Sequence, residues 1–263
     1  MIYIVSVNLF PKNCYSAIRH LFQAELSKPV LLPIQNLSTI KKLKTRFALH
    51  PDERKQAENF RLAKRRNEYL TGRLCARQAL SLFLGKTALP TDDNCLLAIQ
   101  VVNDQDGRPF FYHAEKAYDF PSLSIAHSGN FGIAVVSPSD LLCGVDLQLE
   151  QETLQRISNR FCTHQELQTL ADTIHNTEPE IRLLNRIWSA KEAARKMLGY
   201  WKLPGFLEME LTPTDILNNG LLVLTLKYIP HQKNASESIR ILSGIFRNYS
   251  LAITYMPKGS GGN

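Results

Sequence analysis

Two short patterns recur along the 263-residue chain at almost the same spacing. In one, an aromatic residue is followed four and eight positions later by charged residues: Tyr69, Arg73 and Arg77, and again Trp188, Glu192 and Lys196. In the other, "NFGIAV" from Asn130 resembles "NYSLAI" from Asn248. The offsets are 119 residues (from 69 to 188) and 118 residues (from 130 to 248). A repeat at one offset favours an internal duplication and therefore two similar lobes facing each other about a pseudo-two-fold axis. A cleft between such lobes is a common ligand site.

Local patterns predict strands and helices in both halves. Residues 1–10 alternate β-branched side chains without a basic leader, which indicates a first strand and not a signal peptide, so we expect a cytoplasmic protein. Residues 51–86 read as one long helix with Pro51 in its first turn. Residues 123–137 predict two strands around a Ser-Gly-Asn turn. "THQE" at 163–166 is typical of a capping box that starts a helix.

These elements predict an α+β protein made of two similar α/β lobes. The linker prediction is "PSD" at 138–140, which divides residues 1–139 from residues 140–256 and leaves 257–263 as a flexible tail. No apolar run approaches the roughly 18 residues that a membrane span needs, so we expect no membrane partner. The five cysteines are odd in number and form no CxxC pair, which argues against a disulfide framework and a thiolate metal site.

The net charge of +7 points to anionic partners. Nucleic acid, a phosphorylated cofactor and an acidic protein all fit, and charge alone does not choose among them. Basic residues gather on two predicted helix faces: Arg66, Arg73 and Arg77 on one, and Lys191, Arg195 and Lys196 on the other. Both faces suit phosphates, although solvated helix faces and nucleic-acid stripes look the same at this level.

Two acids are the candidates for chemistry. Asp146 ends an apolar strand in "GVDLQ" and shares a strand face with Gln148, while Glu192 lies in the middle of the polar side of a later helix. If that helix packs on the strand, two carboxylates meet, and they then need a proton or a cation between them. Mg²⁺ suits such oxygen ligands. The alternative is that Asp146 caps a strand end while Glu192 and Lys196 form a solvent-exposed i, i+4 pair.

Several motifs together resemble the Sfp-type 4′-phosphopantetheinyl transferases. They are "GRP" at 107–109, "AHSGNFGIAV" from 126, "GVD" at 144–146 and "WSAKEAARKMLG" from 188, in the order of that family. "KRRNEYLTGRLCARQAL" is similar to the N-terminal helix of the enterobactin-synthase branch. The resemblance covers roughly residues 50 to 200. It implies a cytoplasmic, monomeric, two-lobed pseudodimer with coenzyme A bound between the lobes.

The resemblance also implies roles in binding the metal and the pyrophosphate. Asp146 and Glu192 would hold Mg²⁺, with Gln148 at the position of a third ligand, where the family usually has an acid. Lys191 and Lys196 would contact phosphates or stabilise the departing 3′,5′-ADP.

Other positions would bind the nucleotide or shape the cleft. The turn residues Gly107, Arg108 and Pro109 would line an adenine pocket, and His127 would meet the nucleotide phosphates. Arg66 and Arg73 would bind the 3′-phosphate. Ala126 stands where the family usually has a serine before the histidine. Trp188 would form a wall of the cleft beside the metal carboxylate, which would explain a tryptophan on a polar helix face.

The reaction implied is of the holo-[acyl-carrier-protein] synthase type. A Mg²⁺-dependent enzyme would move 4′-phosphopantetheine from coenzyme A to a serine of an apo acyl or peptidyl carrier protein, with Glu192 as base, and release 3′,5′-ADP. The first alternative is a non-catalytic module that binds coenzyme A or a carrier protein. A nucleic-acid-binding protein is disfavoured, because Asp146 and Glu192 would repel phosphates unless a cation intervenes.

Overall fold

The computed structural model describes residues 14–22, 29–34, 49–85, 96–115, 117–199, 205–217, 220–229 and 236–258. The strand predicted at residues 1–10 and most of the predicted tail lie outside these ranges. Among the helices in these ranges, none combines the length and apolar character needed to cross a membrane.

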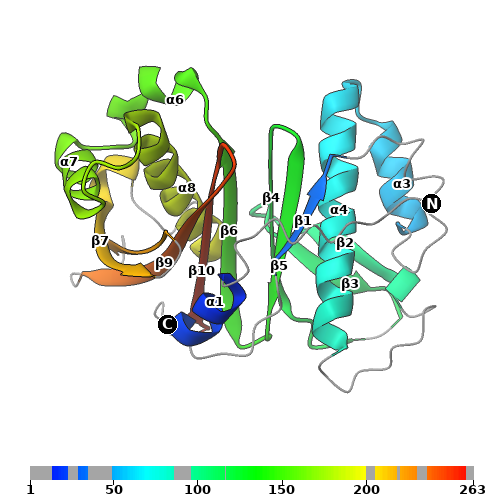
Figure 1. The fold of residues 1–263 in the computed structure, drawn as a ribbon. Coiled ribbons are helices and arrows are strands. Elements are labelled where there is room, and N and C mark those ends of the chain that lie inside the picture. Colours follow the sequence, from blue (N-terminus) through cyan, green and yellow to red (C-terminus); the bar gives the residue numbers. More distant parts are fainter. Residues whose placement is uncertain are drawn as a thin grey trace.

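The first half of the chain builds an antiparallel sheet in the order β1-β5-β4. Its strands are β1 (Val30–Pro33), β4 (Ser122–Ser128) and β5 (Phe131–Ser137). The long helix α4 (Ala63–Leu84) packs against this sheet (Figure 1), with α3 (Pro51–Glu58) beside it. A hairpin of β2 (Ile99–Asn103) and β3 (Pro109–His113) completes this half.

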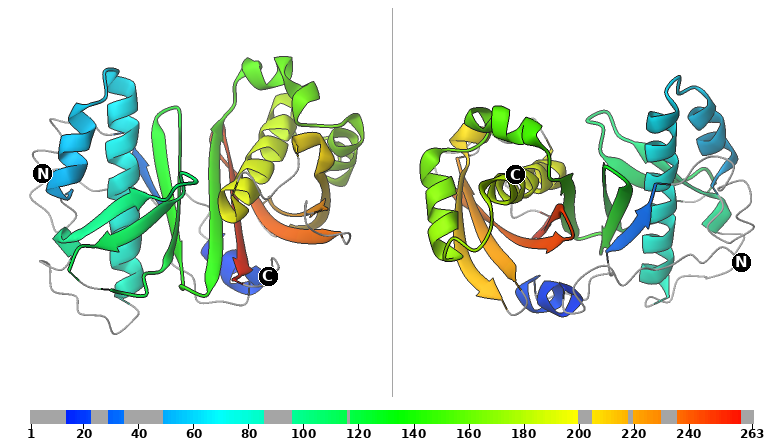
Figure 2. Two further views of the ribbon diagram at one scale, coloured as in Figure 1. Left: turned by 180° about the vertical axis from the view of Figure 1, so that it is seen from behind. Right: turned by 45° about the horizontal axis from the view of Figure 1, so that its top comes forward.

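The second half builds a five-stranded antiparallel sheet in the order β6-β10-β9-β8-β7. Its strands are β6 (Leu141–Leu149), β7 (Glu210–Leu217), β8 (Leu221–Tyr228), β9 (Glu237–Phe246) and β10 (Tyr249–Pro257). This sheet curves around helix α8 (Glu180–Leu198), as Figure 2 shows. The remaining elements here are α6 (Glu152–Arg156), η1 (Ser158–Arg160), α7 (His164–Thr173) and η2 (Phe206–Glu208). Helix α1 (Cys14–Phe22), from the beginning of the chain, packs beside β10 of this second half.

The two halves repeat one topology. When the elements between them are set aside, a strand, a long helix and a strand hairpin occur in the order β1, α4, β4 and β5, and again in the order β6, α8, β9 and β10. The return strand of each hairpin lies in the middle, giving the orders β1-β5-β4 and β6-β10-β9. The two similar sequence patterns start at Asn130 and Asn248, directly before β5 and β10. The mixed α/β fold predicted from the sequence is therefore confirmed.

Strands β4 and β6 meet along a seam between the two sheets. The Ser124 hydroxyl accepts a hydrogen bond of 3.1 Å from the Val145 N–H, and Ser128 accepts one of 3.0 Å from the Leu149 N–H. These two hydroxyls cover part of the outer edge of β6, which pairs with β10 on its other side. Behind the seam, a shared apolar core contains side chains from β5, β6 and β10. The seam fixes the position of β4 relative to β6.

One local prediction, the single helix over residues 51–86, is corrected by the structure. The predicted helix over 51–86 is two helices, because the chain breaks between α3 and α4. This break lets α3 turn back so that Glu53 pairs with the buried Arg77 of α4 at 2.8 Å. Residues 138–140, predicted as a linker, form a tight turn between β5 and β6, in which the Leu141 N–H donates to the Pro138 carbonyl. The predicted start of a helix at Pro51 and the Thr163 capping box are both confirmed.

Candidate active site

An ion pair between β6 and α8 forms the centre of the candidate site. Lys196 Nζ lies 2.7 Å from Asp146 Oδ1. Asp146 is only 6% exposed, and its second carboxylate oxygen, Oδ2, is buried with no hydrogen-bond partner among the described residues. A buried carboxylate oxygen needs a donor or a cation. The predicted meeting of this strand with this helix is therefore confirmed, and it leaves one oxygen for a further ligand.

One oxygen in this site, Asp146 Oδ2, has the chemistry of a magnesium ligand. Glu192 lies one helical turn before Lys196 on α8 and is half-buried. Mg²⁺ commonly takes one or two carboxylates and completes its shell with phosphates and water, which suits Asp146 Oδ2. Gln148 donates its side-chain N–H to the Leu149 carbonyl at 3.0 Å. Within the described ranges, no three His, Cys, Asp or Glu side chains gather as a metal-binding group.

His127 stands on β4, across the seam from Asp146. Its ring Nδ1 lies 3.8 Å from Glu68 Oε2, a carboxylate of α4 whose side chain is 7% exposed. Burial lowers the pKa of His127, and the Glu68 charge opposes that shift. Lys196 and Arg65 also lower this pKa, whereas Asp146 raises it. Charged groups of α4, β6 and α8 therefore all act on His127 of β4.

A tight turn presents the "GRP" residues. Asp104 Oδ1 accepts hydrogen bonds from the N–H groups of Asp106 and Arg108, and Gly107 adopts a φ of 80°, a left-handed conformation that favours glycine. The Arg108 guanidinium lies within 3.3 Å of Asp104 and 3.5 Å of Asp106. On α4, Arg73 donates to Asn103, the residue before this turn, at 3.3 Å. Arg73 is thus held next to the turn.

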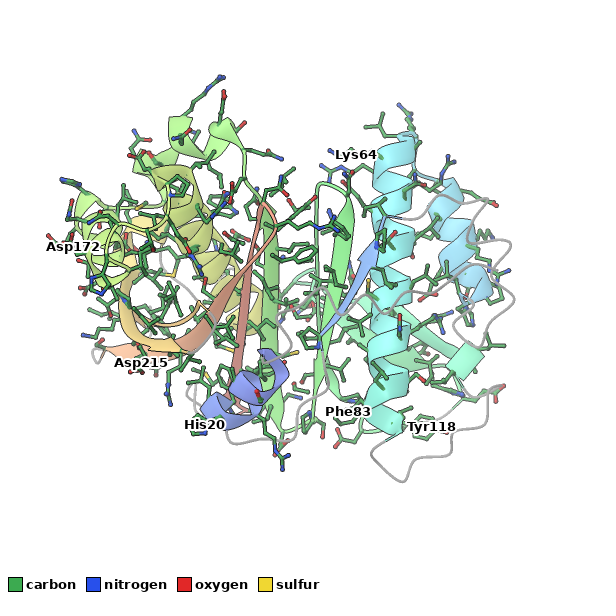
Figure 3. The ribbon with its side chains drawn as sticks, in the orientation of Figure 1. His20, Lys64, Phe83, Tyr118, Asp172 and Asp215 are labelled. Carbon is green, nitrogen blue, oxygen red and sulfur yellow. The ribbon has the colours of Figure 1, made fainter. Side chains whose placement is uncertain are left out.

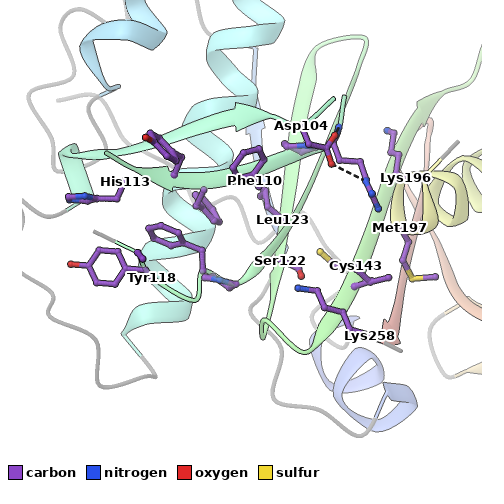
Figure 4. Close-up of a pocket in the computed structure, with 18 of the residues that line it drawn as sticks. Asp104, Phe110, His113, Tyr118, Ser122, Leu123, Cys143, Lys196, Met197 and Lys258 are labelled. Carbon is purple, nitrogen blue, oxygen red and sulfur yellow. Dashed lines mark hydrogen bonds and ion pairs between the residues drawn. The ribbon is translucent and has the colours of Figure 1, made fainter. Parts of the chain in front are cut away.

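A cavity of about 850 Å³ opens beside these groups (Figure 4). Arg108 and Pro109 line it from the turn, and Lys196 and Met197 line it from α8. Aromatic side chains of β3 and the segment after it form another wall, including Phe110 and Tyr118. The structure therefore brings two of the predicted adenine-pocket residues and one predicted phosphate ligand to one cavity.

Comparison with known proteins identifies this part of the chain. Residues 142–254 match the family model described as the 4′-phosphopantetheinyl transferase superfamily, ACPS. This segment is therefore similar to members of that superfamily. It holds Asp146, Gln148, Glu192 and Lys196, and it is less than half of the chain.

Solved structures include a similar chain, a holo-(acyl-carrier-protein) synthase from Bacillus anthracis str. Ames in complex with CoA (3′,5′-ADP). The identity is 24%, the TM-score is 0.30, and the match covers 44% of this chain and 99% of that one. Among curated proteins, none matches.

The structure contradicts the phosphate role predicted for Lys191 in the superfamily segment. This lysine is fully buried, and its ammonium lies 2.7 Å from Glu166 Oε1. It also donates to the carbonyls of Phe161 and Phe206, at 2.8 and 2.9 Å. These three partners match the three donors of an ammonium group, so Lys191 joins three segments of the protein interior.

Trp188 is also wrongly predicted as a wall beside the metal carboxylate. Its ring packs edge-on against Phe161 at 5.0 Å and stacks on Phe206 at 5.2 Å. Phe161 directly follows η1 and Phe206 begins η2, so both short helices pack against α8 at Trp188. The helix is therefore buried on much of its polar side, which explains a tryptophan there without a cleft.

The three arginines predicted to share a face of α4 differ in burial and in partners. Arg77 is buried between Glu53 and two backbone carbonyls, those of Leu96 and Ile99. Arg73 is 9% exposed, and its guanidinium stacks 4.1 Å from the centre of the Tyr69 ring. Arg66 is half-buried. Of the three arginines predicted on this face of α4, Arg66 and Arg73 remain candidates for binding an anionic ligand.

Sequence reasoning missed Glu68 and its neighbour Arg65. The sequence held a signal for this site: Glu68 is an acid within the cationic run "KRRNEYL", and the structure shows that its side chain is buried. It also missed Asp104, which organises the turn before Pro109.

Proposed function

We propose that the protein transfers the 4′-phosphopantetheine group from coenzyme A to a serine of an apo acyl or peptidyl carrier protein, with Mg²⁺, and releases 3′,5′-ADP. The observation that carries the proposal is the buried, unpartnered Asp146 Oδ2 beside Lys196, in a segment of the phosphopantetheinyl transferase superfamily. The cavity next to this pair offers a place for the nucleotide.

In this proposal the residues divide the work by charge. Asp146 and Glu192 would hold Mg²⁺, which when bound neutralises charge on the pyrophosphate. Lys196 stabilises the departing 3′,5′-ADP as the bond from the transferred phosphorus to the bridging oxygen breaks. Glu192 accepts the proton of the attacking serine hydroxyl, which forms the new phosphodiester bond. Charge stabilisation of this kind dominates phosphoryl transfer.

The nucleotide half of coenzyme A is assigned to the first part of the chain. Gly107, Arg108 and Pro109 border the adenine, while His127 binds nucleotide phosphates. Arg66 and Arg73 bind the 3′-phosphate. The net charge of +7 favours association with a carrier protein that is acidic around its serine.

Gln148 is assigned to the surroundings of the metal. Its N–H group is already used on the Leu149 carbonyl, which leaves the amide oxygen to orient a metal-bound water. Replacing Gln148 with alanine should therefore reduce the rate only modestly, and replacing it with glutamate should lower the Mg²⁺ concentration required.

The architecture extends the proposal. Residues 1–139 and 140–256 form two lobes related by a pseudo-two-fold axis, in a monomer. Of the predicted tail at 257–263, Pro257 ends β10 and the Lys258 N–H donates to the Asp140 carbonyl, so these two residues belong to the second lobe. The repeated order of strands and helices supports this arrangement. We assign the protein to the cytoplasm.

Intact-protein mass spectrometry tests the function. With coenzyme A, Mg²⁺ and an apo carrier, the carrier should gain one phosphopantetheine group, and Asp146→Ala should remove this activity. Asp215→Ala is the matched control, because Asp215 is exposed on β7, away from the seam (Figure 3). If several acyl and peptidyl carriers stay unmodified while a control transferase modifies them, the transferase proposal fails, and a binding module becomes the better explanation.

A further inference from the structure

Glu68 is a buried acid in the middle of a cationic surface. Its carboxylate lies 3.3 Å from Arg65, 4.0 Å from Lys64 and 3.8 Å from His127 Nδ1. The Arg65 and Lys64 side chains are 64% and 79% exposed, and Lys64 stands at the N-terminal end of α4 (Figure 3). Three cationic or titratable side chains thus converge on one carboxylate that solvent hardly reaches.

We propose that Glu68 is a positioning residue, the buried counter-charge that holds His127 and Arg65 ready to bind a phosphate group of the nucleotide. The inference rests on the proposed function, because it takes coenzyme A as the ligand of His127. It adds a residue and a mechanism of preorganisation to that site.

The geometry gives His127 two different sides. Nδ1 faces Glu68, and the side chain as a whole is 38% exposed, so part of the ring reaches solvent. A protonated ring can then keep one N–H toward the buried carboxylate while its other N–H donates to a phosphate. Glu68 thereby orients the ring and favours its protonation when a phosphate binds on the other side.

The surroundings of His127 explain why a counter-charge is needed. Burial lowers its pKa, and Lys196 of α8 and Arg65 of α4 act in the same direction. Among the described groups that act on this pKa, Glu68 and Asp146 of β6 favour the protonated ring, and Asp146 is already paired with Lys196. Without Glu68, the ring would remain neutral more readily and lose its attraction for phosphate.

The sign of the effect separates this proposal from simple repulsion. A carboxylate that only repelled the ligand would weaken anion binding, so removing its charge would strengthen binding. A carboxylate that orients His127 and Arg65 does the opposite. Glu68→Gln keeps the shape of the side chain and removes the charge, so it distinguishes the two cases.

The test measures binding of coenzyme A and of 3′,5′-ADP by calorimetry, and turnover with an apo carrier. Glu68→Gln should weaken both ligands about tenfold and raise KM for coenzyme A, with kcat nearly unchanged. In a His127→Gln background, adding Glu68→Gln should weaken binding little further, because Glu68 acts through the His127 ring. Glu152→Gln is the control, since Glu152 also pairs with an arginine but its side chain is 80% exposed.

The outcomes separate the two proposals. A wild-type chain that does not bind coenzyme A refutes the proposed function and this inference with it. If the wild type binds coenzyme A normally and Glu68→Gln binds it equally well or more tightly, only the inference is refuted. The inference is also refuted if Glu68→Gln weakens binding as much in the His127→Gln background as it does in the wild type. Should Glu68→Gln fail to fold, nitrogen NMR of the His127 ring in the wild-type complex decides: both ring nitrogens should be protonated, and an Nδ1 without a proton overturns the proposal.

Discussion

Replacing Lys191 with methionine should destabilise the protein without weakening coenzyme A binding. The change keeps an unbranched side chain of similar length but removes the ammonium, which bonds to Glu166, Phe161 and Phe206 inside the fold. The side chain is fully buried, so water cannot replace the lost partner. A phosphate ligand would behave differently, because its loss would raise KM and leave the fold stable.

The magnitude follows from the groups that lose their partner. Breaking a buried ion pair on one side costs about 3–5 kcal/mol. Glu166 is partly compensated, since it still accepts hydrogen bonds from Thr163 and from the Leu211 N–H. The carbonyls of Phe161 and Phe206 are left without this donor. We therefore expect the lower end, about 3 kcal/mol, or a fall in Tm of roughly 6–12 °C for a protein of this size.

Differential scanning calorimetry and calorimetric titration with coenzyme A provide the assay. Lys227→Met, at an exposed position on β8, is the control and should change Tm by less than about 2 °C. Adding Glu166→Gln to Lys191→Met should recover part of the loss, because the uncompensated charge is then removed. A Tm within about 2 °C of wild type, combined with much weaker binding of coenzyme A, would refute the structural role and restore the phosphate role.

Three further predictions concern the site and its supporting core. Asp146→Asn should reduce transferase turnover at least about a hundredfold while the thermal transition stays cooperative, and turnover near wild type would exclude Asp146 as a metal ligand. Burial lowers the pKa of His127, and a bound phosphate would raise this pKa again. Coenzyme A should therefore bind more tightly as the pH falls from 8 toward 6. Calorimetric titrations in buffers of different ionisation heat should show proton uptake in the wild type and not in His127→Gln. Asn185 is fully buried, and both of its amide atoms lack a hydrogen-bond partner in the part of the chain that the structure describes. Asn185→Leu should therefore stabilise the protein by about 1–3 kcal/mol, measured by denaturant unfolding. A loss of stability would mean that the amide is hydrogen-bonded after all.

The correct predictions came from signals that act over a few residues. The Ser-Gly-Asn turn between β4 and β5 and the Thr163 capping box depend on local backbone preferences, and both are present in the structure. The break between α3 and α4 was missed because its cause is a contact between distant positions. Arg77 needs a buried acid, and only a chain that turns back brings Glu53 to it.

Helix amphipathicity misled the prediction for α8. The periodicity identified the apolar side correctly, but it carries no information about what covers the polar side. In the structure, Phe161 and Phe206 cover part of it, so Trp188 becomes a packing residue and Lys191 a buried one. Lys191 can stay charged in the interior because it pairs with Glu166 there, 2.7 Å away.

The meeting of Asp146 with Lys196 depends on a glycine that the motif alone does not explain. Gly144 lies two residues before Asp146, and a Cβ at this position would lie 2.0 Å from the Ala193 carbonyl oxygen of α8. Its φ is not in the left-handed region, so the missing side chain serves the approach of helix to strand and not a turn. Any larger residue would push α8 away from β6 and lengthen the 2.7 Å contact between Lys196 and Asp146. The glycine of "GVD" is therefore part of the site in the same sense as the acid, since it sets the distance at which the charges of the two elements meet.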